Sequence, residues 1–578
     1  MSSYKGRLFA GGEAARKQPI PWFFEMIQKI DEIRSKVKQP TIPSQIIRRY
    51  RTATDSLKND WQTLRLARSV AKNAVEDKAR RPVIFFNAST RIRGHSLNAA
   101  FSLLASWALR LQGVPLVHFV CHAGMSRCMQ GTDQDDVYRS MPCALCLRQS
   151  RANFAFSTAQ HFTYRRDPVL AAALADLDIQ ALMQYEHPFD GTSIPLGMLV
   201  LPSLRWRLRR LTLADDEPTR FLFREFILSA WNILNEFSLL LDRVKDPQAV
   251  VIFNGQTFPE ATVRWAADRR GVRVITHEVS MYPLSGFFTA GEATALPMPI
   301  AEDFELTPAQ NARLDALMQS RFKGQVSMAG IQFFPEMKGL DETFLQKAAG
   351  FKQIVPVFTN VIFDTTQQHS NAFFPSMFAW LDTVLEVARA HAETLFVVRA
   401  HPDEARPGKV SRESVAMWIE QTKAAELPNF IFVAPDQYIS SYELIRRSKF
   451  VMIYNSTIGL EASIMGVPVL SAGSSRFTRF DTMFFPASQA AYLEQLETFL
   501  AAAQVRILPE HIRNARRFFY FHYFIASLPF GDFIEPSTLR GYVKWKPFAL
   551  QSLSPGASPT IRAILDGILQ AGNFMLKE

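Results

Sequence analysis

The pattern of hydrophobic and polar positions changes at about residue 81. From there, short runs rich in β-branched and aromatic residues alternate with longer stretches whose apolar residues recur at helical spacing. The first series of runs is RPVIFFNAS, VPLVHFVC, AVVIFNG and VRVITHEVS, and the second is QIVPVFTN, ETLFVVRAH, NFIFVAP, KFVMIYNST and VPVLSAG. Strand, helix and strand in succession are typical of parallel sheets with helical crossovers. The pattern therefore predicts an α/β fold with two Rossmann-like parallel-sheet lobes.

Helical patterns flank and separate these lobes, and residues 150–245 also have a mostly helical pattern. We predict a helical N-terminal extension at 1–80, an N-terminal lobe at 81–300, a linker at 301–345, a C-terminal lobe at 346–490 and a C-terminal helical segment at 491–578. In the extension, an apolar stripe of helical spacing is formed by Phe23, Met26, Ile27, Ile30 and Ile33. We favour packing of this stripe on the body of the protein or on a dimer partner. The alternative is an arm that docks on a membrane surface or a partner.

One predicted strand of the C-terminal lobe runs directly into a helix through Ser456 and Thr457. Ligands of open parallel sheets bind at the carboxyl ends of the strands, and a helix start presents free backbone N–H groups that suit a phosphate. Glu461 lies one turn beyond Thr457 on the same face, where it is a candidate to bind ribose hydroxyls. The alternatives are simple N-capping by Ser456 and a solvated glutamate.

Arg399 and His401 end a neighbouring strand of the same lobe. A histidine there can donate a hydrogen bond to a phosphoryl oxygen, and an arginine adds a permanently charged donor. Alternatively, Arg399 forms an ion pair at the strand end and His401 only begins a turn that Pro402 stiffens. Their position beside the run NSTIGLE favours the functional interpretation.

Three segments in this order, VFTNVIFD, VVRAHPDE and YNSTIGLEASIMGVPVLSAG, resemble bacterial capsule-polysaccharide biosynthesis glycosyltransferases of GT-B fold. The resemblance covers about residues 350–480 and extends more weakly through FNGQTFPEATVRWAADRRGVRVITHE in the first lobe. It implies a metal-independent transferase that holds its donor mainly in the second lobe and its acceptor in the first.

By this resemblance, His401, Ser456, Thr457 and Glu461 fall where the family contacts the donor nucleotide. Asn360 and Asp364 match the motif as well, and Asn360 joins the donor-binding candidates without a defined role. The same motifs are similar to those of teichoic-acid glycerophosphotransferases and nucleotide-sugar 2-epimerases. The resemblance therefore indicates the fold more strongly than the reaction.

An inverting glycosyl transfer needs a base that takes the proton of the acceptor hydroxyl as the nucleotide leaves. Glu278 closes the strand VRVITHE of the first lobe and is our first candidate. His95, in the loop after the first strand, is the second. Either residue can instead bind only the acceptor or cap a helix.

The four cysteines of the chain lie close together, at Cys121, Cys128, Cys143 and Cys146. Four thiolates in a short, loop-rich segment suit a tetrahedral structural zinc ion, although only the second pair has the usual C-x2-C spacing. Disulfides are disfavoured in the cytoplasm. An iron–sulfur cluster has no matching signature here, and four unrelated buried cysteines are the remaining alternative. We favour zinc in a structural role and expect no catalytic metal.

The formal net charge of +11 favours phosphate-rich ligands or an anionic membrane surface. The basic residues are dispersed and form no known nucleic-acid-binding pattern, so we expect no nucleic acid partner. No apolar stretch approaches the length of a membrane span, and the N-terminus lacks the pattern of a secretory signal. We therefore expect a cytoplasmic protein and leave open whether it associates peripherally with the inner face of the plasma membrane.

Together these patterns predict a glycosyltransferase with a nucleotide-sugar donor and a growing surface polysaccharide or lipid-linked glycan as acceptor. Two alternatives on the same fold are a polyol-phosphate transferase and a nucleotide-sugar epimerase. A third is a scaffold that binds nucleotide or glycan without turnover.

Overall fold

The structure, a computed structural model, describes residues 44–88, 92–295, 297–323, 337–537 and 541–578. The chain divides into two units at residue 55, and everything below concerns the second, Ser56–Glu578. The predicted apolar stripe at 23–33 lies outside the described residues. No helix in the described part of the chain is long and apolar enough to cross a membrane.

The N-terminal lobe is built on a seven-stranded sheet with the order β14-β8-β7-β6-β1-β2-β3. Its strands are β1 (Val83–Phe86), β2 (Leu116–Cys121), β3 (Ala159–Phe162), β6 (Ala249–Phe253), β7 (Val274–Val279), β8 (Ser285–Ala290) and β14 (Leu528–Pro529). Five of them run parallel, with Val251 of β6 opposite Phe85 of β1 and Ile275 of β7. β8 runs antiparallel to β7, and β14 pairs antiparallel with β8, which the sequence did not predict. Only a short turn joins β7 to β8, and a parallel crossover needs a dozen or more residues.

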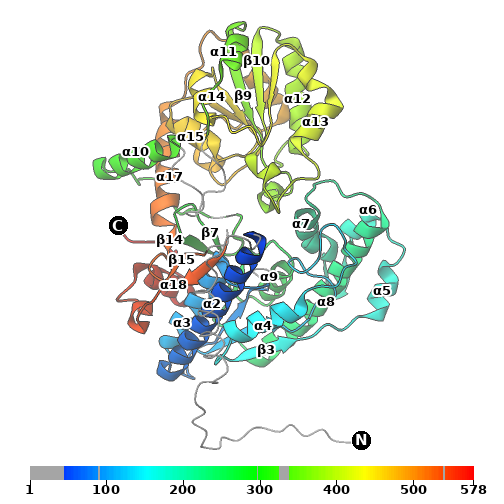
Figure 1. Ribbon diagram of the computed structural model, residues 1–578, viewed down its shortest axis with the longest axis vertical. Coiled ribbons are helices and arrows are strands. Elements are labelled where there is room, and N and C mark those ends of the chain that lie inside the picture. Colours follow the sequence, from blue (N-terminus) through cyan, green and yellow to red (C-terminus); the bar gives the residue numbers. More distant parts are fainter. Residues whose placement is uncertain (1–43, 89–91, 296, 324–336, 538–540) are drawn as a thin grey trace, which may run out of the picture. The chain divides into compact units, whose positions relative to one another are not determined.

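Helices cover both faces of this sheet (Figure 1). One face packs on α7 (Leu196–Leu208), α8 (Glu217–Val244) and α9 (Glu260–Arg269). The other packs on α3 (Leu97–Leu111), α18 (Pro559–Gln570) and the part of α2 (Ser44–Asn73) that follows residue 55. Side chains alternate between the two faces, as the pleat requires: Ile84 belongs to the first core and Phe85 to the second. The remaining elements of the lobe are α4 (Cys143–Asn153), α5 (Pro168–Leu174), α6 (Ile179–Met183) and the hairpins β4 (His187–Phe189)–β5 (Thr192–Ile194) and β15 (Ile534–Pro536)–β16 (Val543–Trp545).

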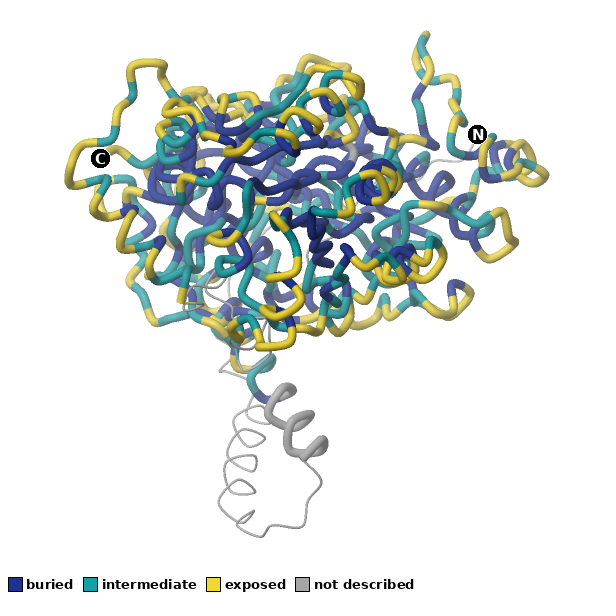
Figure 2. Tube along the Cα trace, turned by 90° about the horizontal axis from the view of Figure 1, so that it is seen from above, coloured by how far each residue is buried: buried dark blue, intermediate teal, exposed yellow. Residues whose placement is uncertain are grey.

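The C-terminal lobe has a five-stranded, fully parallel sheet with the order β11-β10-β9-β12-β13. Its strands are β9 (Gln353–Phe358), β10 (Thr394–Arg399), β11 (Phe430–Val433), β12 (Val451–Ile453) and β13 (Val469–Ser471). One face packs on α12 (Met377–Ala390), α13 (Val415–Thr422) and α16 (Gln489–Ala501). The other packs on α10 (Pro308–Phe322), α11 (Glu342–Ala349), α14 (Ser441–Arg447), α15 (Ile458–Ile464) and α17 (Pro509–Tyr520). Figure 2 shows buried segments of the chain in the interior and exposed segments around them.

Local sequence signals explain where the principal helices begin. Ser96 accepts a hydrogen bond from the backbone N–H of Ala99 at the start of α3, Asp216 caps α8 and Ser376 caps α12. Nearly every residue of α3 is buried, because the helix lies between the sheet and α18. The prediction of two α/β lobes with a helical C-terminal segment is confirmed.

The C-terminal segment connects both lobes. Helix α17 packs on α15, the π-helical turn Phe521–Ile525 follows, and β14 then adds a strand to the N-terminal sheet. The aromatic run 518–525 is buried throughout, and Arg513 and Arg516 pair with Glu305 and Asp315. The aromatic and basic residues of this helix therefore serve internal packing.

Candidate functional site

The carboxyl ends of β9, β10, β12 and β13 meet at one edge of the C-terminal sheet. Asn360, after β9, donates from Nδ2 to Asn455 Oδ1 after β12 at 2.8 Å. Asn455 in turn donates to the Ser370 hydroxyl at 2.5 Å. The Asn360 amide thus ties two strand-end loops together, and its prediction as a donor-binding residue remains untested.

His401 caps the short 3-10 turn Pro402–Ala405 and accepts the backbone N–H of Asp403 at Nδ1, 3.1 Å away. Burial lowers its pKa, against the opposing charges of Asp403 and Asp364. A neutral imidazole that accepts at Nδ1 carries its proton at Nε2. The strand end therefore offers one Nε2–H donor, as a phosphoryl oxygen requires.

Arg399 is buried on another side of the same strand end. Its guanidinium donates to the carbonyl of Ile439 and to Met337 Sδ at 3.8 Å, and burial lowers its pKa to about 10. Both acceptors are neutral, and no carboxylate pairs with Arg399 among the described residues, so the ion pair that we considered from the sequence is not formed. Its donor-binding role stays a prediction.

Ser456 and Thr457 precede α15, and neither hydroxyl forms a hydrogen bond with any residue that the structure describes. Simple capping by Ser456 is therefore not what holds this helix start. Glu461 is only 2% exposed, and both of its carboxylate oxygens are engaged. Arg321 of α10 donates to Oε1 from Nε at 3.0 Å, and the Tyr442 hydroxyl donates to Oε2 at 2.5 Å. Binding of a ribose by Glu461 would have to share these oxygens.

Glu278 lies at the end of β7, and three donors hold its carboxylate. They are Asn98 Nδ2 at 2.8 Å, Asn254 Nδ2 at 3.1 Å and the backbone N–H of Val279 at 2.8 Å. Burial raises its pKa and outweighs these hydrogen bonds, and the charge of Asp364 acts in the same direction. Asp364 follows β9, so Glu278 lies close to a strand end of the C-terminal lobe.

Arg476 follows β13 and lies within electrostatic reach of both Glu278 and Asp364. It forms no hydrogen bond or ion pair with any described residue, and burial lowers its pKa. His522 of the π-helical turn also lies within electrostatic reach of Arg476. The residues Glu278, Asp364, His401, Lys409 and Arg476 are called the interlobe polar cluster below.

Lys409 approaches the same region from the loop after His401. Burial and the charge of Arg406 lower its pKa, whereas Asp403 and Asp364 raise it. Its ammonium group has no hydrogen bond or ion pair among the described residues. Arg209 of the N-terminal lobe lies nearby, donates to the Gly408 carbonyl at 2.8 Å and stacks 3.9 Å from the Trp206 ring. Burial, with three neighbouring arginines, lowers the pKa of Arg209 to about 10.

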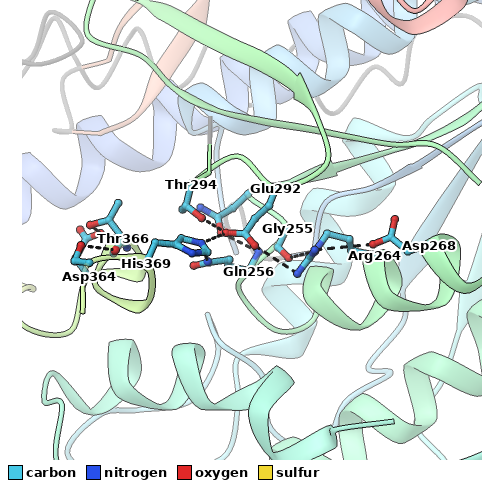
Figure 3. A network of polar contacts seen from close by, with 11 residues as sticks. Gly255, Gln256, Arg264, Asp268, Glu292, Thr294, Asp364, Thr366 and His369 are labelled. Atoms are coloured by element: carbon cyan, nitrogen blue, oxygen red, sulfur yellow. Dashed lines mark hydrogen bonds and ion pairs between the residues drawn. The ribbon is translucent and has the colours of Figure 1, made fainter. Parts of the chain in front are cut away.

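A second set of polar contacts joins the lobes directly (Figure 3). His369 donates from Nε2 to Glu292 Oε1 at 2.5 Å, and the side-chain amide of Gln256 lies 2.5 Å from the same nitrogen. Arg264 Nη2 lies 3.6 Å from Glu292 Oε2. The bond to Glu292 raises the pKa of His369. These contacts hold the loop after β9 against the N-terminal lobe.

His95, the second candidate base, is not part of the interlobe polar cluster. It is buried against the Trp545 ring, and its Nδ1 lies 2.7 Å from Asn59 Nδ2. Burial lowers its pKa to about 4. A neutral, enclosed imidazole of this kind contributes to packing, so the structure gives Glu278 the better position of the two.

The four cysteines converge on one cavity of about 70 Å³ in the N-terminal lobe. All are free thiols, and burial raises the pKa of each. Among the described residues, however, no three His, Cys, Asp or Glu side chains are placed to hold a single metal ion. The zinc prediction therefore gains no support from this arrangement.

Sequence reasoning missed Arg476, Lys409 and the contact of His369 with Glu292. The signal for Arg476 was present, since it closely follows the predicted strand VPVLSAG. Lys409 lies several residues beyond the end of β10, and it comes close to His401 only because the loop folds back. Its distance along the sequence from the strand therefore did not indicate a place in the site.

Residues 332–480 match the family described as capsule polysaccharide biosynthesis protein. No curated protein matches the chain. Among solved structures, the Thermosulfurimonas dismutans KpsC beta Kdo 2,7 transferase is 13% identical, with a TM-score of 0.30 over 54% of this chain and 85% of that one. The beta Kdo 2,4 transferase of the same KpsC is 9% identical, with a TM-score of 0.30 over 53% and 87%.

The UDP-GlcNAc 2-epimerase of Neisseria meningitidis is 11% identical, with a TM-score of 0.23 over 76% of this chain and 98% of that one. Structural similarities of this size support no argument about the reaction. The family match, in contrast, includes every donor-binding candidate named from the sequence. The C-terminal lobe is thus similar to capsule polysaccharide biosynthesis proteins over residues 332–480, which confirms the resemblance that its strand-end motifs indicated.

Proposed function

We propose that this protein is a GT-B-type glycosyltransferase that moves a sugar from a nucleotide-sugar donor to a growing surface polysaccharide or lipid-linked glycan. The observation that carries the proposal is the interlobe polar cluster. It brings a carboxylate of the N-terminal lobe to the strand-end edge of the lobe that matches the capsule polysaccharide family.

The donor nucleotide would bind at the C-terminal strand ends. His401 offers its Nε2–H, Lys409 an ammonium group without a partner among the described residues, and Ser456 and Thr457 two hydroxyls. Fixed donors of this kind stabilise the negative charge that develops on a leaving phosphate, because they need no reorganisation during the reaction. Arg209 adds positive charge from the opposite lobe.

Glu278 would act as the general base on the acceptor hydroxyl. Its raised pKa makes the ionised carboxylate a stronger base than an exposed glutamate, while Asn98 and Asn254 fix its orientation. Arg476 lies close enough to favour the ionised form of Glu278. Its guanidinium can also contact the sugar or the phosphate that lies between the two lobes.

The proposed reaction uses no metal ion, so activity should survive chelation by EDTA. We also propose that the protein acts at the inner face of the plasma membrane when its acceptor is lipid-linked. The net charge of +11 favours attraction to anionic lipids. Sedimentation with anionic and neutral vesicles measures this association directly.

Product analysis tests the proposed function. A thermal-shift screen of the full chain against UDP-, GDP-, CMP- and CDP-linked compounds first identifies the donor, because a ligand of the folded state raises Tm. The radiolabelled donor is then incubated with glycan acceptors. Label in an extended glycan supports the proposal. Transfer of a polyol phosphate, isomerisation of the donor, or tight binding without any product contradicts it.

A further inference from the structure

All four cysteines of the chain line a single cavity of the N-terminal lobe, far along the sequence from the donor-binding residues. Cys121 ends β2, Cys128 lies in the following loop, and Cys143 and Cys146 lie in the first turn of α4. Each sulfur is within electrostatic reach of the other three. Three separate chain segments therefore bring their thiols to one place.

The rest of the cavity wall carries no charge and no histidine. Its apolar side chains include Ile92, Leu103, Phe119, Met125, Met141 and Phe154. Of the lining groups, the four thiols are the strongest ligands for soft metals, and the thioethers of Met125 and Met141 are weaker ones. A metal-containing occupant would be held mainly by the thiols.

Backbone N–H groups point at two of the sulfurs. Gly124 N donates to Cys121 Sγ at 3.3 Å, and Gly131 N donates to Cys128 Sγ at 3.1 Å. A Cβ atom on Gly131 would lie 3.0 Å from Cys128 Sγ, so a larger residue would crowd the sulfur. Hydrogen bonds of this type stabilise thiolates and tune iron–sulfur clusters. The positive end of α4 also favours a thiolate at Cys143, the first residue of that helix.

A single ion and a larger group place different demands on the four thiols. Four sulfurs at about 2.3 Å from one zinc ion lie only about 3.8 Å from one another. In the part of the chain that the structure describes, no three His, Cys, Asp or Glu side chains are placed to hold one metal ion. The cavity measures about 70 Å³. That is several times the roughly 10–15 Å³ that a single water needs.

We propose that this cavity binds a [4Fe–4S] cluster through Cys121, Cys128, Cys143 and Cys146. Each thiol loses its proton and forms one bond to an iron of a preassembled cluster, so no electrons pass between the chain and the cluster on binding. The bound cluster joins the end of β2, the loop after it and α4 into one unit. This inference concerns the N-terminal lobe alone and does not depend on the proposed glycosyl transfer.

The test uses the full chain, produced with sufficient iron and purified without oxygen. We expect about four iron and four acid-labile sulfide per chain, with broad visible absorbance that decreases on reduction by dithionite. About one zinc per chain without sulfide overturns the proposal in favour of a single ion. So does a protein that contains neither iron nor zinc, or one with only two iron and two sulfide.

A pair of variants checks the ligands. Cys143→Ser should lose most of the iron and sulfide, whereas Met141→Leu, which changes another side chain of the same wall, should retain both. Equal iron and sulfide in the two variants overturns the assignment. If Cys143→Ser does not fold, the wild-type protein is instead exposed to oxygen and a chelator. We then expect the visible absorbance to disappear and Tm to decrease, and an unchanged Tm counts against the cluster.

Discussion

At the scale of single residues, the carboxylate of Glu278 combines burial with three hydrogen-bond donors and a nearby guanidinium. Glu278→Gln keeps the shape of the side chain but removes the base. We expect turnover to decrease by about 10²–10⁴-fold, with little change in nucleotide affinity. Steady-state kinetics and nucleotide titration measure the two effects separately. Glu225→Gln, at a buried carboxylate that pairs with Arg166 elsewhere in the N-terminal lobe, is the control and should retain turnover.

The same residue predicts a pH dependence. A general base must be ionised, so activity decreases as the pH falls through the pKa of Glu278. Because burial raises that pKa, the acid limb of kcat/KM should lie at higher pH than an exposed glutamate would give. If the acid limb of kcat/KM lies at or below the pKa of an exposed glutamate, Glu278 is not the base.

Lys409 has no hydrogen bond or ion pair among the described residues, although burial disfavours its charge. A bound phosphate would supply the missing partner. Lys409→Gln should therefore weaken nucleotide binding about tenfold or more, since a hydrogen bond to a charged group contributes about 1.5–3 kcal/mol. Lys449→Gln is the matched control, because Lys449 bonds Gln353 at the other end of β9. Isothermal titration compares the two variants, and equal affinities exclude Lys409 from the donor site.

At the scale of elements, the runs of apolar residues predicted the strands of the C-terminal lobe well. β9 to β13 are buried on both faces, so their sequences are nearly continuous apolar runs. The apolar runs did not predict strands whose formation depends on tertiary contacts. The strand β3, AQHF, has little apolar character, and β14 has only two residues that pair with β8 across a long sequence separation.

The candidate site was predictable to a similar extent. His401, Ser456 and Glu278 lie at strand ends, where a general rule for parallel sheets places ligands. The partners of Glu461 were not predictable, since Arg321 comes from α10 and Tyr442 from α14. Pairing of a buried charge depends on how helices pack, and no local pattern encodes it.

The C-terminal segment offers a prediction at this scale. Phe530, just after β14, is fully buried and stacks on Phe101 of α3 with ring centroids 4.3 Å apart. Phe530→Ala should destabilise the N-terminal lobe by about 3–5 kcal/mol. Nucleotide affinity should remain, because the donor residues belong to the other lobe. Leu508→Ala, at an exposed position, is the control, and a similar Tm for both variants would contradict this role of the segment.

At the scale of the whole molecule, the contact of His369 with Glu292 makes the association of the two lobes dependent on pH. The charged groups around this contact are Arg264, which faces Glu292, and Asp268, which faces Arg264. The bond to Glu292 raises the pKa of His369, whereas the pKa of Glu292 is lowered despite its burial. Both groups are therefore charged between the lowered carboxyl pKa and the raised imidazole pKa.

The stabilisation from this ion pair is present below the ordinary histidine pKa and is lost as the pH rises through the raised value. We expect the lobes to separate more often at alkaline pH, which interlobe energy transfer between two attached dyes would report as a smaller signal. His369→Gln keeps a donor toward Glu292 but cannot titrate, so its signal should not change over the same range. If the variant and the wild-type protein respond alike, another group controls the contact. A more frequent separation should also move the donor-binding strand ends of the C-terminal lobe away from Glu278 and so reduce turnover at alkaline pH.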